Sequence, residues 1–400
     1  KRIETAVTTD PSQLDFDGLR PPGPGLGESH SAWRKQLRDF VDTRVAPSIE
    51  DWNAAGSFPD KLYIQAADAG LLGFGFPADY GGWQDDPDLY HRILFAEEFH
   101  RLGSGVVFAD LATHWIALPP VVRFGSEELQ KAVTRPVLAG QKRMAFAVTE
   151  PGGGSDVARL ATTAELDAGH YRVNGCKSLI SGALRAYFLL TVVRTGGEGL
   201  GGLSLLLIDA DSDGISMEPV PGLTWYSASN ATIRFENTEV RTDCLIGAVN
   251  AAFKALAALF IVERFSGFVA TMAMAGVATA DAIACDREWE TFGKRLVEHQ
   301  RIRHTLIDMV RAIHSGYAYL DQCVWRFENG EVPVADLSML KTQATRTLEH
   351  CAREALQILG GEAYRADSRV QRIHREARIF SLGGGTEEIL NDLAARQLGF

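Results

Sequence analysis

The chain has 400 residues, of which 46% are hydrophobic and 23% charged, and its formal net charge is −11. This balance is typical of a soluble protein that is long enough for two or three packed units. The negative charge disfavours general nucleic-acid binding, and no membrane span is expected because the most apolar stretch, residues 255–262, ends at Glu263 and Arg264.

Cysteine usage indicates a reducing compartment. The cysteines are scattered and never form a CxxC pair, so we expect reduced thiols that pack as small hydrophobic residues. The chain shows no signal-peptide pattern and no recognisable set of metal ligands. We therefore expect a cytoplasmic bacterial protein or, in a eukaryote, one of the mitochondrial matrix. The cysteines are Cys176, Cys244, Cys285, Cys323 and Cys351.

The N-terminal third divides into a leader and a helical region. Residues 1–29 lack apolar periodicity and contain Pro-Pro-Gly-Pro-Gly at residues 21–25, which indicates a mobile leader. Residues 30–142 predict an N-terminal helical domain, because apolar side chains recur there at helical spacing. Examples of this spacing are Leu37, Phe40, Val41 and Val45.

The middle of the chain, residues 143–249, changes character. Short runs rich in apolar and β-branched residues alternate with glycine, asparagine and proline turns. Because no long helix lies between the runs, we expect a small antiparallel barrel or sandwich rather than βαβ units. Residues 250–400 return to long helical patterns. The predicted strands are residues 144–148, 171–173, 189–193, 204–208, 215–219 and 231–236.

Five motifs in order resemble the acyl-CoA dehydrogenase family, over about residues 30–400. TEPGGGSD at residues 149–156 is similar to the family's TEPGxGSD signature, and TFGKRLVEHQ at residues 291–300 is similar to its TFGKxLxEHQ segment. The resemblance implies FAD as cofactor and an α+β multidomain fold with an N-terminal helical domain, a central β-barrel or sandwich and a C-terminal four-helix bundle. The other motifs are QILGG at residues 357–361 with GTEEI at 385–389, FPADYGG at 76–82 and FGSEE at 124–128.

The resemblance also implies which segments contact the flavin ring. A glycine-rich loop allows the main chain to approach the ring closely, and nearby hydroxyl groups can hydrogen-bond its edge. In the family, a hydroxyl matching Ser181 bonds near N5, and the residue matching Leu179 is usually aromatic. The expected flavin contacts are Phe146, Val148, Thr149, Ser155, Leu179 and Ser181.

The adenine dinucleotide part of FAD is expected to bind partly across a subunit interface, which implies a homodimer or a homotetramer. Trp289 departs from the family here, because relatives usually carry an arginine at this position for the FAD pyrophosphate. Thr386 with two following glutamates is also typical of an ordinary helix N-terminus. The expected contacts are His299, Gln300, Gln357, Gly361, Thr386 and Glu388.

The implied reaction is α,β-dehydrogenation of an acyl thioester, in which a carboxylate takes the α-proton and hydride passes from the β-carbon to flavin N5. Many relatives carry this base in a C-terminal loop, where Gly384 stands here. A group resembling isovaleryl- and long-chain acyl-CoA dehydrogenases carries it in a Glu-Arg pair, which matches Glu263 and Arg264. We expect Glu263 to be the base and Gly384 to offer its N–H to the thioester oxygen. The alternative is a surface or structural ion-pair role for Glu263.

Substrate, partners and competing functions follow from the same resemblance. Gly267 lies one helical turn after Glu263 and would leave room for a bulky acyl chain. The expected partners are an acyl-CoA or an acyl carrier protein thioester, and an electron-transfer flavoprotein. A flavin-dependent monooxygenase on the same fold and a non-catalytic flavin-holding module stay open as alternatives. The expected substrate contacts are Ser155, Arg264, Gly267 and Gly385.

Overall fold

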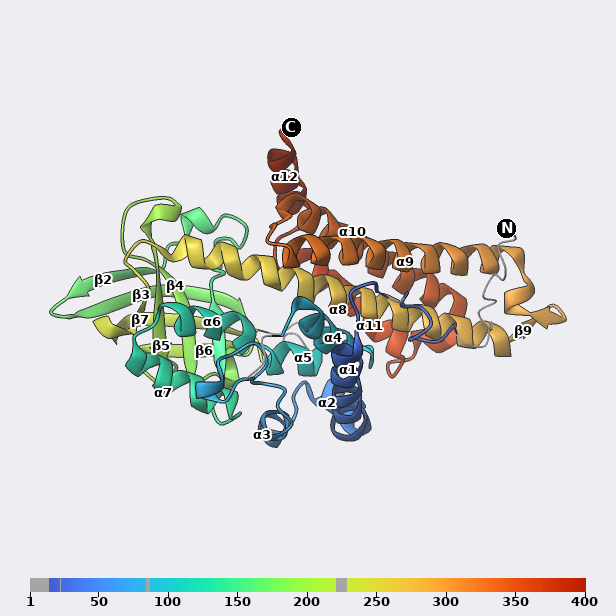
Figure 1. Cartoon of the computed structure of the whole chain (residues 1–400), viewed down its shortest axis with the longest axis horizontal. Helices are drawn as coiled ribbons and strands as arrows, with labels where there is room; N and C mark the ends of the chain where they lie inside the picture. Colours follow the sequence, from blue (N-terminus) through green and yellow to red (C-terminus); the bar gives the residue numbers. More distant parts are fainter. Residues whose placement is uncertain (1–13, 22, 84–86, 221–228) are drawn as a thin grey trace. The chain divides into compact units, whose positions relative to one another are not determined.

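The computed structural model describes residues 14–21, 23–83, 87–220 and 229–400 and groups them into two compact units (Figure 1). Unit 1 consists of the segment up to Ala32, Ala96–Ser104 and Arg264–Phe400. Unit 2 consists of Trp33–Phe95 and Gly105–Glu263. The N-terminal helices and the strands share unit 2, so the domain boundary predicted near residue 142 lies inside it.

The N-terminal part of unit 2 is helical, as the apolar spacing predicts, and its core is aromatic. The rings of Trp33 and Phe74 stack with centroids 5.8 Å apart, and those of Phe95 and Trp115 are 4.4 Å apart. Burial of these rings stabilises helices that are too short to persist alone. The helices are α1 (Glu28–Phe40), α2 (Ile49–Ala55), α3 (Lys61–Asp68), α4 (Leu89–His100), α5 (Val106–Leu111), α6 (His114–Phe124) and α7 (Glu127–Leu138); α1 and α4 extend into unit 1.

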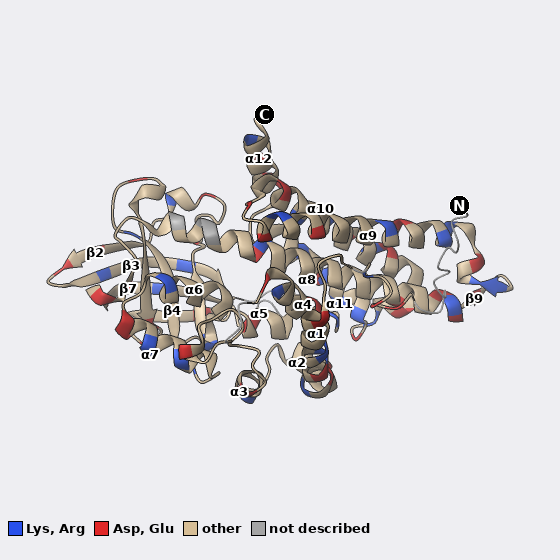
Figure 2. Cartoon of the chain, viewed as in Figure 1, with Lys and Arg blue, Asp and Glu red and all other residues tan. Residues whose placement is uncertain are grey.

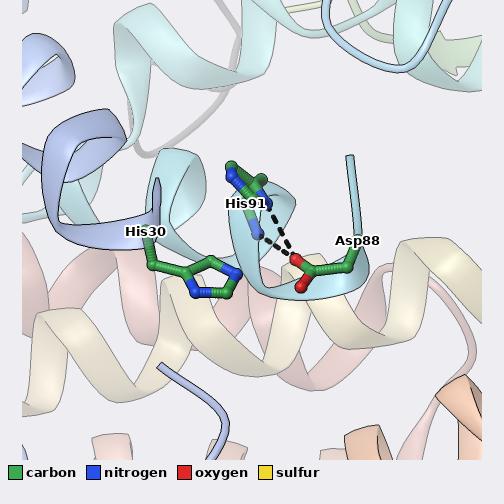
Figure 3. A group of neighbouring side chains, drawn as sticks. All are labelled: His30, Asp88 and His91. Carbon is green, nitrogen blue, oxygen red and sulfur yellow. Dashed lines mark hydrogen bonds and ion pairs between the residues drawn. The ribbon is translucent and has the colours of Figure 1, made fainter. Parts of the chain in front are cut away.

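The start of α4 is capped by a side chain. Asp88 precedes the helix, and its Oδ1 accepts a hydrogen bond from the backbone N–H of His91 at 3.2 Å (Figure 3). The same oxygen lies 2.8 Å from His91 Nδ1. Because the first N–H groups of a helix have no partner within it, an aspartate here satisfies one of them and defines where the helix begins.

The described strands of unit 2 form one eight-stranded sheet with the order β6-β7-β3-β2-β4-β5-β8, and β1 pairs with β4. All six predicted runs are strands. Two more, β2 and β8, were not predicted, because β2 is largely polar and exposed and β8 has only two residues. Pairing is antiparallel except for β1 with β4 and β2 with β4. The strands are β1 (Met144–Ala147), β2 (Thr163–Asp167), β3 (His170–Ile180), β4 (Phe188–Arg194), β5 (Leu203–Asp209), β6 (Ile215–Pro219), β7 (Ala231–Arg241) and β8 (Leu245–Ile246).

Long helices build most of unit 1, and α10 packs against three of the others: α9, α11 and α12. α8 and α9 approach closely at Gly316, where a Cβ would lie 2.7 Å from the end of the Met272 side chain. A short hairpin of β9 (Glu290–Thr291) and β10 (Lys294–Arg295) separates α8 from α9. The helices are α8 (Ala252–Glu288), α9 (Gln300–Glu328), α10 (Val334–Leu359), α11 (Arg369–Leu382) and α12 (Glu387–Leu398); α8 belongs to unit 2 up to Glu263 and to unit 1 from Arg264.

One part of α8, Leu259–Glu288, is long and apolar enough to cross a membrane by length and composition alone. Its most apolar window is nevertheless 78% buried inside the protein. A helix at the centre of a bundle passes the same test, because it is apolar on every side. Elsewhere, acidic and basic residues are interspersed along the described helices and strands (Figure 2).

Part of the predicted leader is packed in unit 1. Leu19 and Arg20 are both buried. Arg20 Nε lies 2.6 Å from Glu97 Oε1, and the Arg20 guanidinium lies 4.7 Å from the ring centroid of Tyr317. Tyr317 completes the cluster by donating a hydrogen bond to Glu97 Oε1 at 3.1 Å. The expectation of a mobile leader is therefore wrong for these residues, because a buried arginine that is paired in this way is held in place.

Candidate active site

The glycine-rich loop after β1 is exposed and open. Residues 151–156 are all exposed, and a turn closes where Gly153 N donates to Glu150 O at 3.0 Å. A Cβ added at Gly152 or Gly153 would have no described atom within 4 Å, and neither residue has a positive φ. The packing of the chain therefore does not require glycine here. The open space leaves the backbone accessible to a flat ligand such as the flavin implied by the resemblance.

A buried ion pair lies at the base of this loop. Lys177, which is 0% exposed, donates to Glu150 Oε1 at 2.9 Å and to Val148 O at 3.0 Å. Glu150 also accepts hydrogen bonds from the backbone N–H groups of Ala161 at 2.7 Å and Thr162 at 2.9 Å. The TEPGGGSD motif contains Glu150, but the sequence predicted neither the ion pair that Glu150 forms nor the part of Lys177 in it.

The pair lowers the pKa of its acid, while burial lowers the pKa of its base. Burial lowers the pKa of Lys177 to about 8, although the carboxylate of Glu150 opposes this shift. Burial raises the pKa of Glu150, but Lys177 and the two backbone donors outweigh it, so that its pKa is lowered overall. A charged pair that is removed from water in this way is stable only when its remaining hydrogen-bonding positions are satisfied.

The two predicted flavin segments lie side by side. Ser178 N, from β3, donates to Thr149 O at 2.8 Å, which brings the residue before Leu179 to the glycine-rich loop. β3 has one extra residue relative to β7 between Lys177 and Ile180, and Leu179 there has a φ of 59°. This β-bulge turns the Leu179 side chain outward, where it is 58% exposed. A left-handed leucine costs about 1–2 kcal/mol, a strain that is typical of functional positions.

The other predicted flavin contacts have different degrees of exposure. Ser155 is exposed within the loop, while Phe146, Val148 and Ser181 are half-buried at or near the ends of β1 and β3. Ser181 precedes Gly182, which has a φ of 72°. Unit 2 thus brings the segment of residues 146–155 and the segment of residues 179–181 together where β1 and β3 end.

A polar cluster that sequence reasoning missed supports the turn at Gly182. A Cβ at Gly182 would lie 3.0 Å from Thr113 Cγ2 and 3.5 Å from Asp110 Oδ1. Asp110 accepts a hydrogen bond from Ser229 Oγ at 2.5 Å and pairs with Arg185 at 3.4 Å, and burial raises its pKa. No local motif predicts this cluster, because Asp110 and Arg185 are 75 residues apart in sequence.

Unit 1 carries the residues predicted for the adenine dinucleotide part. His299 is half-buried, and its Nε2 lies 3.0 Å from Thr291 Oγ1 of the β9–β10 hairpin. Gln300, Gln357 and Gly361 are exposed, and a Cβ at Gly361 would meet no described atom within 4 Å.

Large aromatic residues are exposed on the same hairpin. Phe292, at its tip, has a φ of 52° and is 98% exposed, and Trp289 is 41% exposed. Phe292 is almost entirely uncovered by the described residues and Trp289 is only partly covered, and exposed apolar rings of this kind are typical of surfaces that contact a partner or a ligand.

The loop between α11 and α12 contains the position of the absent carboxylate. Gly384 and Gly385 have φ values of 68° and 101°. Lys341 Nζ donates to Gly385 O at 2.8 Å, which fixes the direction of that carbonyl. Thr386 caps α12 by accepting from the backbone N–H of Ile389 at 3.4 Å, as the helix-start interpretation predicts. Glu388 is exposed, and hydrogen bonds from its own backbone N–H and from Thr386 lower its pKa.

The predicted base lies in α8. Glu263 and Arg264 are both half-buried, and the division between the units falls between them. Gly267 is one helical turn further on, and a Cβ there would have no described atom within 4 Å. A carboxylate that shares a helix face with an open space is a suitable arrangement for a general base beside an acyl chain.

Comparisons with known proteins identify the family of the chain. Models described as the acyl-CoA dehydrogenase N-terminal, middle and C-terminal domains match residues 27–141, 145–238 and 253–399. The chain is 31% identical to acyl-CoA dehydrogenase AFT10-1 of Alternaria alternata, over 94% of this chain and 93% of that protein. It is 29% identical to the caffeyl-CoA reductase-Etf complex subunit CarC of Acetobacterium woodii, over 91% of this chain and 96% of that protein.

A solved structure agrees at the level of the fold and the sequence. The crystal structure of a putative acyl-CoA dehydrogenase from Mycobacterium smegmatis superposes with a TM-score of 0.90 at 38% identity, covering 94% of this chain and 99% of that one. The chain therefore belongs to the acyl-CoA dehydrogenase family, whose members are FAD-dependent oxidoreductases.

Proposed function

We propose that the chain is an FAD-dependent acyl thioester dehydrogenase in which Glu263 abstracts the α-proton. The observation that carries the proposal is the open glycine loop of unit 2, which lies beside the outward-turned Leu179. Phe146, Val148, Thr149, Ser155 and Ser181 would hold the ring with them. The adenine dinucleotide part would be held by His299, Gln300, Gln357, Gly361, Thr386 and Glu388.

The chemistry assigned to the residues is proton abstraction and charge stabilisation. Glu263 takes the proton from the α-carbon, and the electron pair of that bond forms the new double bond as the β-hydrogen leaves as hydride. When bound, the flavin supplies the hydride acceptor. The Gly384 N–H donates to the thioester oxygen, where negative charge develops. Lys341 supports this role, because its bond to Gly385 O restrains the neighbouring peptide.

The substrate contacts are proposed to be Ser155, Arg264, Gly267 and Gly385. The open space at Gly267 supports an acyl chain that is branched or bulky. We take coenzyme A as the carrier and an acyl carrier protein as the alternative. The name of the CarC relative supports an electron-transfer flavoprotein as partner, and it also indicates that a related chain works in the reductive direction.

We also propose that the chain forms at least a homodimer. The observation that supports it is the β9–β10 hairpin, which presents Phe292 and Trp289 beside the residues assigned to the dinucleotide. A second copy that contributes to the FAD site would cover these rings. Light scattering of the FAD-bound protein tests this, and a strictly monomeric FAD-bound protein would contradict it.

The experiment that tests the function is anaerobic mixing of the FAD-bound protein with a panel of acyl-CoAs. We expect the oxidised flavin absorbance to disappear with at least one thioester. Glu263→Gln is expected to slow this reduction by about 10²–10⁴-fold with FAD still bound, the usual contribution of a general base. Glu288→Gln, at the exposed end of the same helix, is the matched control and should leave the rate unchanged.

Other outcomes favour the alternatives. Reduction that survives Glu263→Gln would contradict the base assignment. Oxygen-dependent hydroxylation of a substrate with externally supplied reduced flavin would favour a monooxygenase. Reduction by an acyl carrier protein thioester, without reduction by its CoA ester, would select that carrier. Purified protein that cannot take up FAD would exclude the proposed function altogether.

A further inference from the structure

Two buried side chains, Lys177 and Glu150, hydrogen-bond to the backbone at the two ends of the exposed flavin loop. Residues 151–156 are exposed, yet both ends of the segment that contains them are attached to one ion pair. Lys177 donates to the carbonyl of Val148 at the entry. Glu150 accepts from the N–H groups of Ala161 and Thr162 at the exit.

These hydrogen bonds are made to backbone N–H and C=O groups, so the pair orients the main chain of the loop. An ion pair in an apolar environment is a poor source of stability, because packed hydrophobic residues of similar volume often stabilise a fold equally well. Hydrogen bonds to main-chain N–H and C=O groups, in contrast, determine how peptide planes are oriented. Here they orient the peptides at Val148, Ala161 and Thr162, on both sides of the open glycines.

The same strand carries Lys177 inward and Leu179 outward. The extra residue of β3 lies between Lys177 and Ile180, directly after the lysine. Ser178, between Lys177 and Leu179, donates its N–H to Thr149 O. The lysine that holds the loop and the leucine beside the loop are thus two positions apart on one irregular stretch of backbone, so a displacement of one is transmitted to the other.

We propose that Lys177 and Glu150 are positioning residues that hold the backbone of residues 148–154 in the shape that receives the flavin ring. This inference rests on the proposed function, since it assumes that the loop binds flavin. Neither side chain contacts the ring in this role: each acts through the main chain. Loss of the pair is expected to loosen the flavin while the rest of the sheet remains folded.

The test compares three variants with the wild type, all in the FAD-bound form. In Glu150→Leu/Lys177→Met, apolar side chains of similar volume fill the site, so that the fold is retained while the bonds to the backbone are lost. Lys177→Met alone leaves Glu150 without its partner. Lys131→Met removes a lysine from an exposed ion pair with Glu127 and is the matched control. Circular dichroism establishes which variants are folded.

The readouts are the rate of FAD release, followed by the rise of free-flavin fluorescence, and the visible spectrum of the bound flavin. We expect the double variant to release FAD at least tenfold faster than the wild type and to lose fine structure in its absorption band. Lys131→Met should match the wild type in both. A folded double variant with wild-type release and spectrum would overturn the proposal.

The outcomes separate the inference from the proposed function. Wild-type protein that binds FAD but is not reduced by any acyl thioester would contradict the dehydrogenase, while the FAD-release comparison would still decide the role of Lys177 and Glu150. Wild-type protein that binds no FAD would overturn both. If Lys177→Met does not fold, the FAD-release rate and the flavin spectrum of the double variant alone decide whether Lys177 and Glu150 position the loop.

Discussion

Each unit contains a glycine-rich loop next to a buried lysine, and the two loops use glycine for different reasons. In unit 2, Gly152 and Gly153 have ordinary φ values and open space, so that glycine leaves room for something outside the chain. In unit 1, Gly384 and Gly385 have positive φ values, so that glycine serves the backbone itself. The same residue type therefore indicates ligand access in one loop and a required turn in the other.

The lysines differ in the same way. Lys177 is paired with a carboxylate and bonds one carbonyl, while Lys341 bonds the carbonyl of Gly385. The first holds the entry of an exposed loop, whose exit is held by its partner Glu150, and the second holds a turn that leads directly into α12. Substitutions that separate stability from ligand binding will show whether this contrast is correct.

The largest effect on stability is expected from Lys177→Met. It leaves the buried Glu150 carboxylate without its cation, which typically costs about 3–5 kcal/mol. Urea denaturation should show this loss in the free energy of unfolding of unit 2, while the exposed Lys131→Met changes little. A loss no greater than that of Lys131→Met would show that the pair is not important for unit 2.

Asp286 of unit 1 provides the contrast of a buried acid that is not paired. It is 0% exposed, neither of its oxygens has a hydrogen-bond partner among the described residues, and burial raises its pKa to about 6. Because the folded state then binds its proton more tightly than the unfolded chain, the contribution of Asp286 to stability should fall as pH rises from about 4 to 6. Asp286→Ala should therefore stabilise the protein by about 2–3 kcal/mol above pH 6 and by little below pH 4.

Melting temperatures of the wild type and Asp286→Ala across this pH range check the prediction. The difference between the two proteins should appear between pH 4 and 6 and stay constant above it. An equal difference at pH 4 and pH 7 would show that packing, rather than titration of Asp286, causes it.

Gly384→Ala is expected to have a smaller effect, of about 1–2 kcal/mol, because an alanine at a φ of 68° is strained. Gly383, with a φ of −71°, is the control in the same loop, and its change to alanine should cost less. Thermal unfolding measures both. If the two variants lose the same stability, the loop does not depend on left-handed backbone at Gly384.

The smallest effect on stability is expected at Gly152. Gly152→Ala should change the free energy of unfolding by less than about 0.5 kcal/mol, since its methyl group meets no described atom within 4 Å. It should still weaken FAD binding several-fold, whereas Gly201→Ala, at another exposed and open glycine, should not. FAD titration of the two variants, with melting curves, separates ligand access from folding. Equal FAD affinity in both would contradict the ligand-access interpretation.

Much of the fold could be predicted because its signals are local. The strand runs and the long helices are read from periodicity, and all six predicted runs are strands. β2 could not be found in this way, since Thr163–Asp167 is mostly polar and is a strand because β3 pairs with it. The burial of Arg20 could not be predicted from the leader itself, because its partners Glu97 and Tyr317 are distant in sequence.

The candidate site could be predicted only in part. The resemblance implies that the segments of residues 146–155 and 179–181 both contact the flavin; the bond between Ser178 and Thr149 brings these segments together, while their flavin contacts stay a prediction. The pair of Glu150 and Lys177 was missed, because its members are 27 residues apart. A signal existed: Tyr171 and Val173 predict that every second residue of this strand faces the core, which makes Lys177 a charged residue on the apolar side.

The bulge at Leu179 also has a consequence for how this segment can evolve. Up to Lys177 the odd-numbered residues of β3 face the core, and after the bulge Ile180 does so instead. Removing one residue between them would restore simple alternation with Ile180 still facing the core, but it would abolish the bulge and with it the left-handed backbone that Leu179 adopts there. Selection is therefore expected to act on the length of this stretch more strongly than on the identity of its side chains. In a library of variants, single-residue deletions at positions 178–179 should be eliminated, while many substitutions at the same positions persist.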